Sequence, residues 1–158
     1  MRVGDVVLYH GGNNWISRVI KRVTRSEYSH VGVYVGDGFV AEAQLNGFVY
    51  THKFDPKDYE GVNVYRLKKD KRFKKSVFRE VVNNYIGRRY GFLDLIRIFI
   101  FTYTGLKTSR RSKGMICSEA VAQVYRDLGV DLFPGRNLDF VTPACFGRLK
   151  SLKRVRFD

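Results

Sequence analysis

The chain has 158 residues, of which 44% are hydrophobic, with 15 Gly and 3 Pro. This length and composition predict a single globular domain over 1–158 and exclude a collagen-like, low-complexity or largely disordered chain. Lys and Arg number 29 against 15 Asp and Glu, a net charge of +14. We therefore expect an anionic partner, such as nucleic acid, a membrane surface or an acidic polymer.

The N-terminal sequence and the two cysteines bear on the compartment. The first residues contain no apolar core of signal-peptide length, and the longest apolar stretch, 96–103, is too short to span a bilayer. Two cysteines do not make a disulfide framework, which is typical of a reducing compartment. These features predict a cytoplasmic protein, and a phage or viral origin fits the same sequence.

The first part of the chain predicts mainly strands. Apolar alternation and β-favouring residues occur in several short segments, and Gly36-Asp37-Gly38 predicts a tight turn between two of them. One segment, 15–25, has helical spacing of its apolar residues. The predicted strands are 3–9, 30–35, one that begins at 39, 48–50 and 62–67.

Helical periodicity follows in the second part. Residues 73–86 form an amphipathic pattern that ends at Gly87, 92–101 is apolar on most of its surface, and a third helix starts near Cys117 and ends before Gly129. Hairpins followed by helices predict an α+β fold, with a small antiparallel sheet or barrel packed against helices. A basic tail closes the chain.

Common ligand motifs are absent from the sequence. It contains no CxxC pair, HExxH, GxxxxGK[ST], GxGxxG or GxSxG, and no zinc-finger or RNP motif. We therefore expect no metal, no cofactor and no specific nucleic-acid site.

Cys117 stands at the expected start of the third helix. The free N–H groups and the positive dipole end of a helix N-terminus stabilise a thiolate, and they can also face a developing oxyanion. The alternative is a small buried residue that packs the helix start. For the second cysteine, Cys145, we expect a buried structural thiol.

Two further side chains fit this chemistry. His30 begins a strand, where it could take the thiol proton, although a surface or core-edge histidine is the simpler reading and describes His10 and His52. Glu42 follows the predicted turn, which brings it back level with the region of His30, where a carboxylate could orient the imidazole. Its alternative is a solvated strand residue. Tyr9 is a weaker candidate for a hydroxyl donor nearby.

Taken together, these motifs resemble the permuted NlpC/P60 papain-like hydrolases of the YiiX/YaeF type. The similar runs are Gly4–Leu8, Tyr28–Gly38, Val40–Ala43, Tyr90–Phe92, Ile116–Ala120 and Val141–Pro143, so the resemblance spans about 3–148. It implies a circularly permuted papain-like fold, because His30 precedes Cys117. It also implies Cys117 as nucleophile, His30 as base and Glu42 as the orienting third member, with no metal or cofactor.

The lecithin:retinol acyltransferase-like proteins belong to the same permuted group. They carry a second His as third member and an Asn-Cys-Glu-His motif, whereas this chain has Glu42 and Ile116-Cys117-Ser118-Glu119. This difference favours the bacterial-type branch.

The leading expectation is a cysteine amidase or peptidase acting on a peptide-like bond, such as one in cell-wall peptide, or on an acyl amide. The alternatives are a phospholipid acyl hydrolase or acyltransferase, and a non-catalytic basic module that binds membrane or nucleic acid.

Much of the positive charge lies in three stretches. Residues 66–75 contain seven Lys and Arg, and further basic residues lie in 105–113 and 148–156. These stretches form either ordinary solvated faces or an anion-binding surface. If the apolar helix expected over 92–101 is exposed beside Arg88 and Arg89, it would suit an anionic membrane; core packing is its simpler role.

Overall fold

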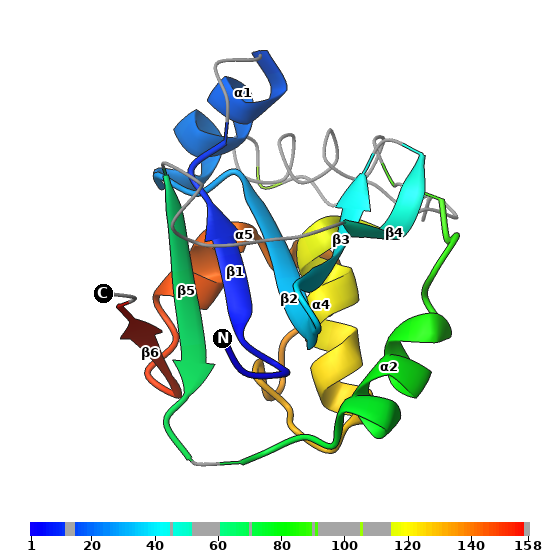
Figure 1. The fold of residues 1–158 in the computed structure, drawn as a ribbon. Coiled ribbons are helices and arrows are strands. Elements are labelled where there is room, and N and C mark those ends of the chain that lie inside the picture. Colours follow the sequence, from blue (N-terminus) through cyan, green and yellow to red (C-terminus); the bar gives the residue numbers. More distant parts are fainter. Residues whose placement is uncertain are drawn as a thin grey trace.

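The computed structural model describes residues 1–11, 15–44, 46–51, 61–69, 71–89, 91, 105 and 115–156. Within them the chain forms one antiparallel sheet and helices that pack beside it (Figure 1). The elements in chain order are β1 (Val6–Tyr9), α1 (Trp15–Thr24), β2 (His30–Gly36), β3 (Phe39–Gln44), β4 (Gly47–Thr51), β5 (Val62–Leu67), α2 (Lys75–Asn83), α4 (Cys117–Asp127), η1 (Leu138–Phe140), α5 (Pro143–Gly147) and β6 (Leu152–Val155).

The sheet has the strand order β4-β3-β2-β1-β5-β6, and each neighbouring pair is antiparallel. β1 lies at its centre, where Tyr9 pairs with His30 on one side and with Val62 on the other. The β2–β3 hairpin turns at Asp37 and Gly38, both at positive φ. The last strand, β6, comes from the basic C-terminal tail and pairs with β5 at the sheet edge.

The main core lies between the sheet and α4. Alternate residues of β2 and β3 point toward this helix, among them Val31, Val33 and Ala41, and all three are fully buried. α4 presents Ala120, Val121 and Val124 to the same core, also fully buried. Small and β-branched side chains on both surfaces allow a close approach of the helix, which fixes the position of its first residue relative to β2 and β3.

The α+β class and its antiparallel sheet are therefore confirmed, and most predicted elements are found. The prediction of a strand over 3–9 is wrong for 3–5, because Gly4 adopts a positive φ and the backbone N–H of Asp5 turns back to the carbonyl of Arg2. α5 and β6 were not predicted. The helix expected over 92–101, the stretch 96–103, His52 and most of the basic stretch 105–113 lie outside the described residues.

Two other expectations concern single features. Cys145 is half-buried rather than buried, and its sulfur contacts the hydroxyl of Thr142 at 3.4 Å. In the part of the chain that the structure describes, no helix is long and apolar enough to cross a bilayer.

Candidate active site

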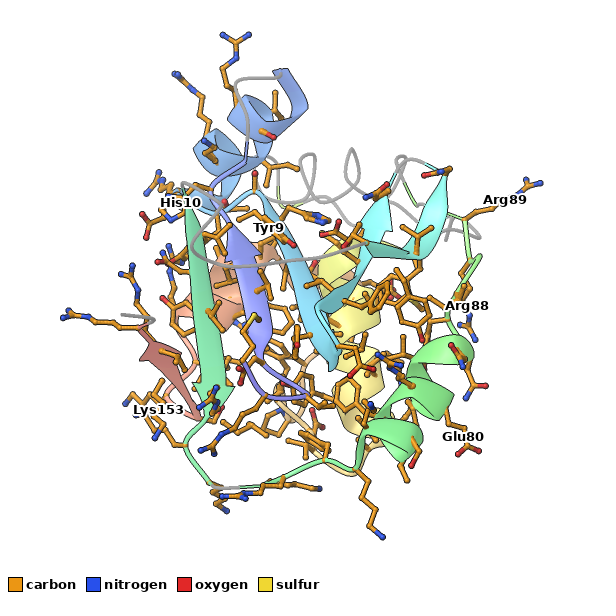
Figure 2. The ribbon with its side chains drawn as sticks, in the orientation of Figure 1. Tyr9, His10, Glu80, Arg88, Arg89 and Lys153 are labelled. Atoms are coloured by element: carbon orange, nitrogen blue, oxygen red, sulfur yellow. The ribbon has the colours of Figure 1, made fainter. Side chains whose placement is uncertain are left out.

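Three chain segments meet at one end of the sheet. β1 ends there at Tyr9, β2 begins there at His30, and β3 brings Glu42 back along the hairpin. Figure 2 shows Tyr9 at this end of β1, with His10 beside it. The hairpin turn at 36–38 sets the register, in which Glu42 pairs with Gly32. His30 precedes Gly32 by two residues, so its side chain and that of Glu42 are diagonal neighbours on the same face.

Gly32 leaves the space that this diagonal contact needs. A Cβ at this position would lie 2.6 Å from Val40 Cγ1, which is too close for a side chain, and 3.2 Å from Glu42 Cβ, which is a tight contact. The Glu42 side chain thus passes over a bare backbone position toward the imidazole. His30 Nε2 and Glu42 Oε2 are 3.1 Å apart, with the two side chains 26% and 10% exposed.

The imidazole also hydrogen-bonds to the Cys117 side chain. Because Nε2 faces Glu42, the second ring nitrogen is left for the sulfur. Cys117 is the first residue of α4 and is 2% exposed, and it follows an extended Ile116. The sequence-predicted Cys117, His30 and Glu42 are therefore brought together, with the histidine between the other two.

The electrostatics of this group favour a charged imidazole. Burial lowers the pKa of His30, but the charge and hydrogen bond of Cys117 and the hydrogen bond and charge of Glu42 outweigh it and raise the pKa to about 10. For Glu42, burial opposes ionisation, yet the hydrogen bond and charge of His30, with smaller contributions from Gln44 and Tyr9, hold its pKa below the ordinary value. The Glu42 carboxylate is thus ionised beside an imidazole whose charged form it stabilises.

Glu42 has two further donors. Gln44 Nε2 donates to its Oε1 at 3.2 Å, and the Tyr9 hydroxyl donates to the same carboxylate. The Tyr9 ring also lies against the His30 ring, with centroids 5.2 Å apart. Tyr9, which the sequence offered only as a weak candidate, thus contacts both members of the His–Glu pair. Its signal was a polar-tipped residue at the end of the apolar run of β1.

The start of α4 is anchored on the other side by Ser118. Its hydroxyl donates to the carbonyl of Val141, in the segment between η1 and α5. The first N–H groups of a helix have no acceptor within the helix, so the start of α4 offers backbone donors beside the Cys117 sulfur. Such donors can stabilise an anion that forms next to the sulfur.

A separate polar network lies beneath the start of β2. The side-chain amide of buried Asn63 donates to the Tyr28 hydroxyl at 2.8 Å and lies 2.9 Å from His10 Nε2. The Tyr28 and Tyr65 hydroxyls are 3.0 Å apart, and His10 Nδ1 lies 3.5 Å from a Glu27 carboxylate oxygen. Burial, followed by the hydrogen bond with Tyr65, raises the pKa of Tyr28. His10 is therefore a member of a structural network that fixes the residues leading into His30.

Gly11 completes this support. A Cβ there would lie 1.8 Å from the hydroxyl of buried Ser29, so the Gly11 backbone packs directly on the residue before His30.

Among the described residues, no group of three or more His, Cys, Asp or Glu is arranged to hold a metal ion.

No protein-family model and no curated protein matches this sequence. A solved structure is similar: the metalloprotein YiiX from Escherichia coli O157:H7, assigned to domain of unknown function 1105. The TM-score is 0.66 and the sequence identity 19%, with 99% of this chain and 97% of the other covered. At this identity the similarity concerns the fold, and it extends over nearly the full length of both chains. The chain therefore shares the fold of YiiX.

Proposed function

We propose that this protein is a cysteine hydrolase of the permuted NlpC/P60 papain-like type, cleaving a peptide-like or acyl amide bond. The observation that carries the proposal is the placement of the His30 imidazole between the Cys117 sulfur at a helix start and the Glu42 carboxylate. A nucleophile, a base in contact with it and a third group that orients the base are the recurring parts of such enzymes. The order of His before Cys in the chain is consistent with a circular permutation of that arrangement.

In the first half-reaction the Cys117 sulfur attacks the carbonyl carbon of the substrate, and the imidazolium holds the proton that has left the thiol. The carbonyl oxygen becomes an oxyanion, which the backbone N–H groups at the start of α4 stabilise. As the tetrahedral species collapses, the C–N bond breaks and His30 gives its proton to the leaving nitrogen. The products are a free amine and a thioester on Cys117.

In the second half-reaction water attacks the thioester. The now neutral His30 takes one proton from the water, and the C–S bond breaks to release a carboxylic acid and a Cys117 thiolate beside an imidazolium. Glu42 keeps the ring orientation fixed through both halves and stabilises its charged form. Tyr9 and Gln44 position Glu42 in turn, through their hydrogen bonds to the carboxylate.

YiiX is named a metalloprotein, so a metal centre is a second reading of this fold. A divalent transition metal takes three or four His, Cys or carboxylate ligands around one point. In the described part of this chain no such group exists, and the Glu42 and Cys117 side chains lie on different sides of one imidazole. These residues do not fit a metal centre, and the proposed steps use none.

The proposal is tested by turnover of two substrate panels, acyl-peptide amides and phospholipids, with intact-mass detection of an acyl-enzyme. We expect hydrolysis of an amide, an acyl adduct on Cys117, and loss of both in Cys117→Ser and His30→Ala. Cys145→Ser is the matched control and retains both. An adduct formed only from phospholipid would assign the site to lipid acyl hydrolysis or transfer instead. Absence of any adduct, together with binding of anionic vesicles or nucleic acid, would contradict the hydrolase assignment and leave a basic binding module.

A further inference from the structure

A strongly basic pocket lies at the opposite end of β1 from the catalytic residues. It has a volume of about 320 Å³ and lies between the turn before β1 and the segment that follows β5. Tyr9 is at one end of the sheet, whereas Lys153 of β6, which pairs with Arg66, lies toward the other end (Figure 2). The pocket is lined by Arg2, Val3, Gly4, Asp5, Arg66, Leu67, Lys69, Lys71, Arg72 and Phe73.

Positive charge dominates this lining. Five of the described lining residues are Arg or Lys and one is acidic, so these residues carry a net charge of +4. The carboxylate, Asp5, is 1% exposed and is held by Arg66 through two hydrogen bonds of 2.7 Å each. It also accepts the backbone N–H of Arg2 at 2.7 Å. Asp5 is thus engaged inside the wall, and the charge that faces the pocket is cationic.

The pocket wall is rigid where it meets the sheet. The N–H of Gly4 donates to the carbonyl of Tyr34 at 2.8 Å, and the N–H of Asp5 donates to the carbonyl of Arg2 at 2.9 Å. A Cβ on Gly4 would lie 2.6 Å from the Phe73 ring, so this backbone packs directly on the aromatic side chain. The basic side chains on the following segment therefore surround a preformed concave surface. Concave basic surfaces concentrate anions.

We propose that this pocket binds a phosphate group, carried either by an anionic lipid or by a soluble phosphorylated molecule. Guanidinium groups match the oxygens of a phosphate in a planar, two-pronged contact, and lysine adds point charge. The exposed side chains of Lys69 and Arg72 would reach the phosphate from the rim. Lys71, whose ammonium donates to the carbonyl of Leu128 at 3.1 Å, adds positive charge beside them. Four of the seven basic residues in 66–75, Arg66, Lys69, Lys71 and Arg72, thereby belong to a site rather than to a solvated face. The inference does not depend on the catalytic proposal.

The test compares binding of three probes to the full-length chain by titration calorimetry and vesicle flotation: pyrophosphate, phosphatidylcholine vesicles and phosphatidylcholine vesicles containing phosphatidic acid. The pocket variant is Lys69→Gln/Arg72→Gln. The charge-matched control is Arg18→Gln/Arg22→Gln, which changes two exposed residues of α1 at the other end of the molecule. All substituted side chains are exposed, so both variants should keep the wild-type melting temperature.

We expect the pocket variant to bind at least about tenfold more weakly, because it removes two charged donors from the rim, and the control to bind within about twofold of wild type. Binding of pyrophosphate assigns a soluble ligand, whereas binding confined to phosphatidic acid vesicles assigns a lipid headgroup. Equal weakening by both variants would show diffuse charge attraction and overturn the site. Absence of binding to all three probes would overturn it as well.

Discussion

Replacing Glu42 by Gln tests how far the carboxylate sets the protonation state of His30, the proposed general base. The substitution preserves shape and removes the charge next to His30 Nε2, 3.1 Å away. A hydrogen bond to a charged group contributes about 1.5–3 kcal/mol, and 1.36 kcal/mol corresponds to one pH unit. The pKa of His30, about 10 in the wild-type protein, should therefore fall to about 8–9. The same free energy predicts a decrease in kcat/KM of about ten- to hundredfold.

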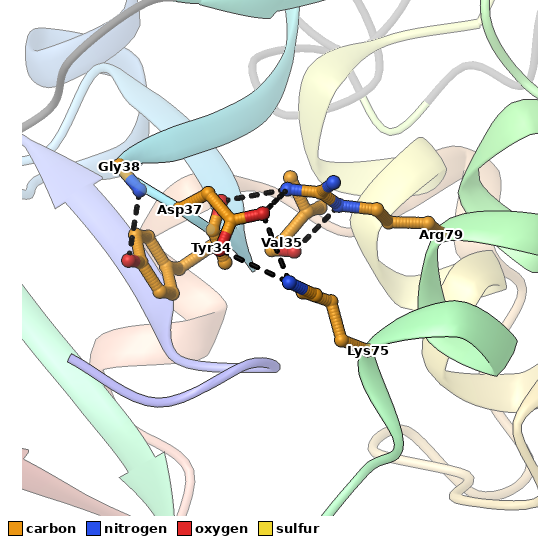
Figure 3. A network of polar contacts seen from close by, with 7 residues as sticks. Tyr34, Val35, Asp37, Gly38, Lys75 and Arg79 are labelled. Atoms are coloured by element: carbon orange, nitrogen blue, oxygen red, sulfur yellow. Dashed lines mark hydrogen bonds and ion pairs between the residues drawn. The ribbon is translucent and has the colours of Figure 1, made fainter.

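The assay is an NMR titration of the imidazole signals, in which the other two histidines serve as internal references. Asp37→Asn is the matched control, because it makes the same chemical change in the hairpin turn. There Asp37 forms ion pairs of 3.0 Å with Lys75 and Arg79 and joins α2 to the sheet (Figure 3). The control should leave the His30 titration unchanged. An unchanged His30 titration in Glu42→Gln, or an equal change in Asp37→Asn, would refute the pairing.

Three further predictions concern the same end of the sheet. Tyr9→Phe removes one donor to Glu42, which should raise the pKa of that carboxyl and lower kcat about tenfold with KM unchanged, as steady-state kinetics would show. Gly32→Ala places a methyl 2.6 Å from Val40 Cγ1, and thermal unfolding should show a loss of about 1–3 kcal/mol. The pKa of His30 is raised from 6.5 to about 10 in the folded protein. The charged imidazole therefore stabilises the folded state fully below pH 6.5, and this stabilisation disappears as the pH rises toward 10. Denaturant unfolding should show the difference between wild type and His30→Gln shrinking over that range.

These three predictions fail in distinct ways. An equal fall in kcat and rise in KM for Tyr9→Phe would make Tyr9 a substrate contact rather than a positioning residue. A wild-type melting temperature in Gly32→Ala would show that the strands are looser than described. A stability difference for His30→Gln that grows with pH would mean that the neutral imidazole is the favoured form.

The three candidate residues, Cys117, His30 and Glu42, could be predicted from the sequence because their signals are local. A cysteine at a helix start, a histidine at a strand start and a hairpin turn at the right distance before Glu42 are each visible in short windows. The turn fixes the register, and the register makes the diagonal contact of His30 and Glu42. The role of Gly32 in that contact could not be read in advance, since it depends on the side chains of the next strand.

The parts that could not be predicted depend on contacts between distant segments. β6 becomes a strand only because the edge of β5 is available to it, and its basic residues give no strand pattern. Asp5 and Arg66 are far apart in the sequence, and only the pairing of β1 with β5 brings them together. The basic run 66–75 was visible as charge, but the turn at Gly4 that makes it one wall of a pocket was not.

The most direct test of the central claim is the labelling rate of Cys117 by iodoacetamide across pH, with Cys145 as the internal standard and peptide mapping to separate the two. Cys145 is half-buried and Cys117 is 2% exposed, so exposure alone would make Cys145 the faster thiol. We predict the reverse well below pH ~8.5, where a free thiol is mainly protonated, and we predict that His30→Ala abolishes the advantage of Cys117. A slower Cys117 at every pH, or a rate unchanged by His30→Ala, would contradict a thiolate–imidazolium pair.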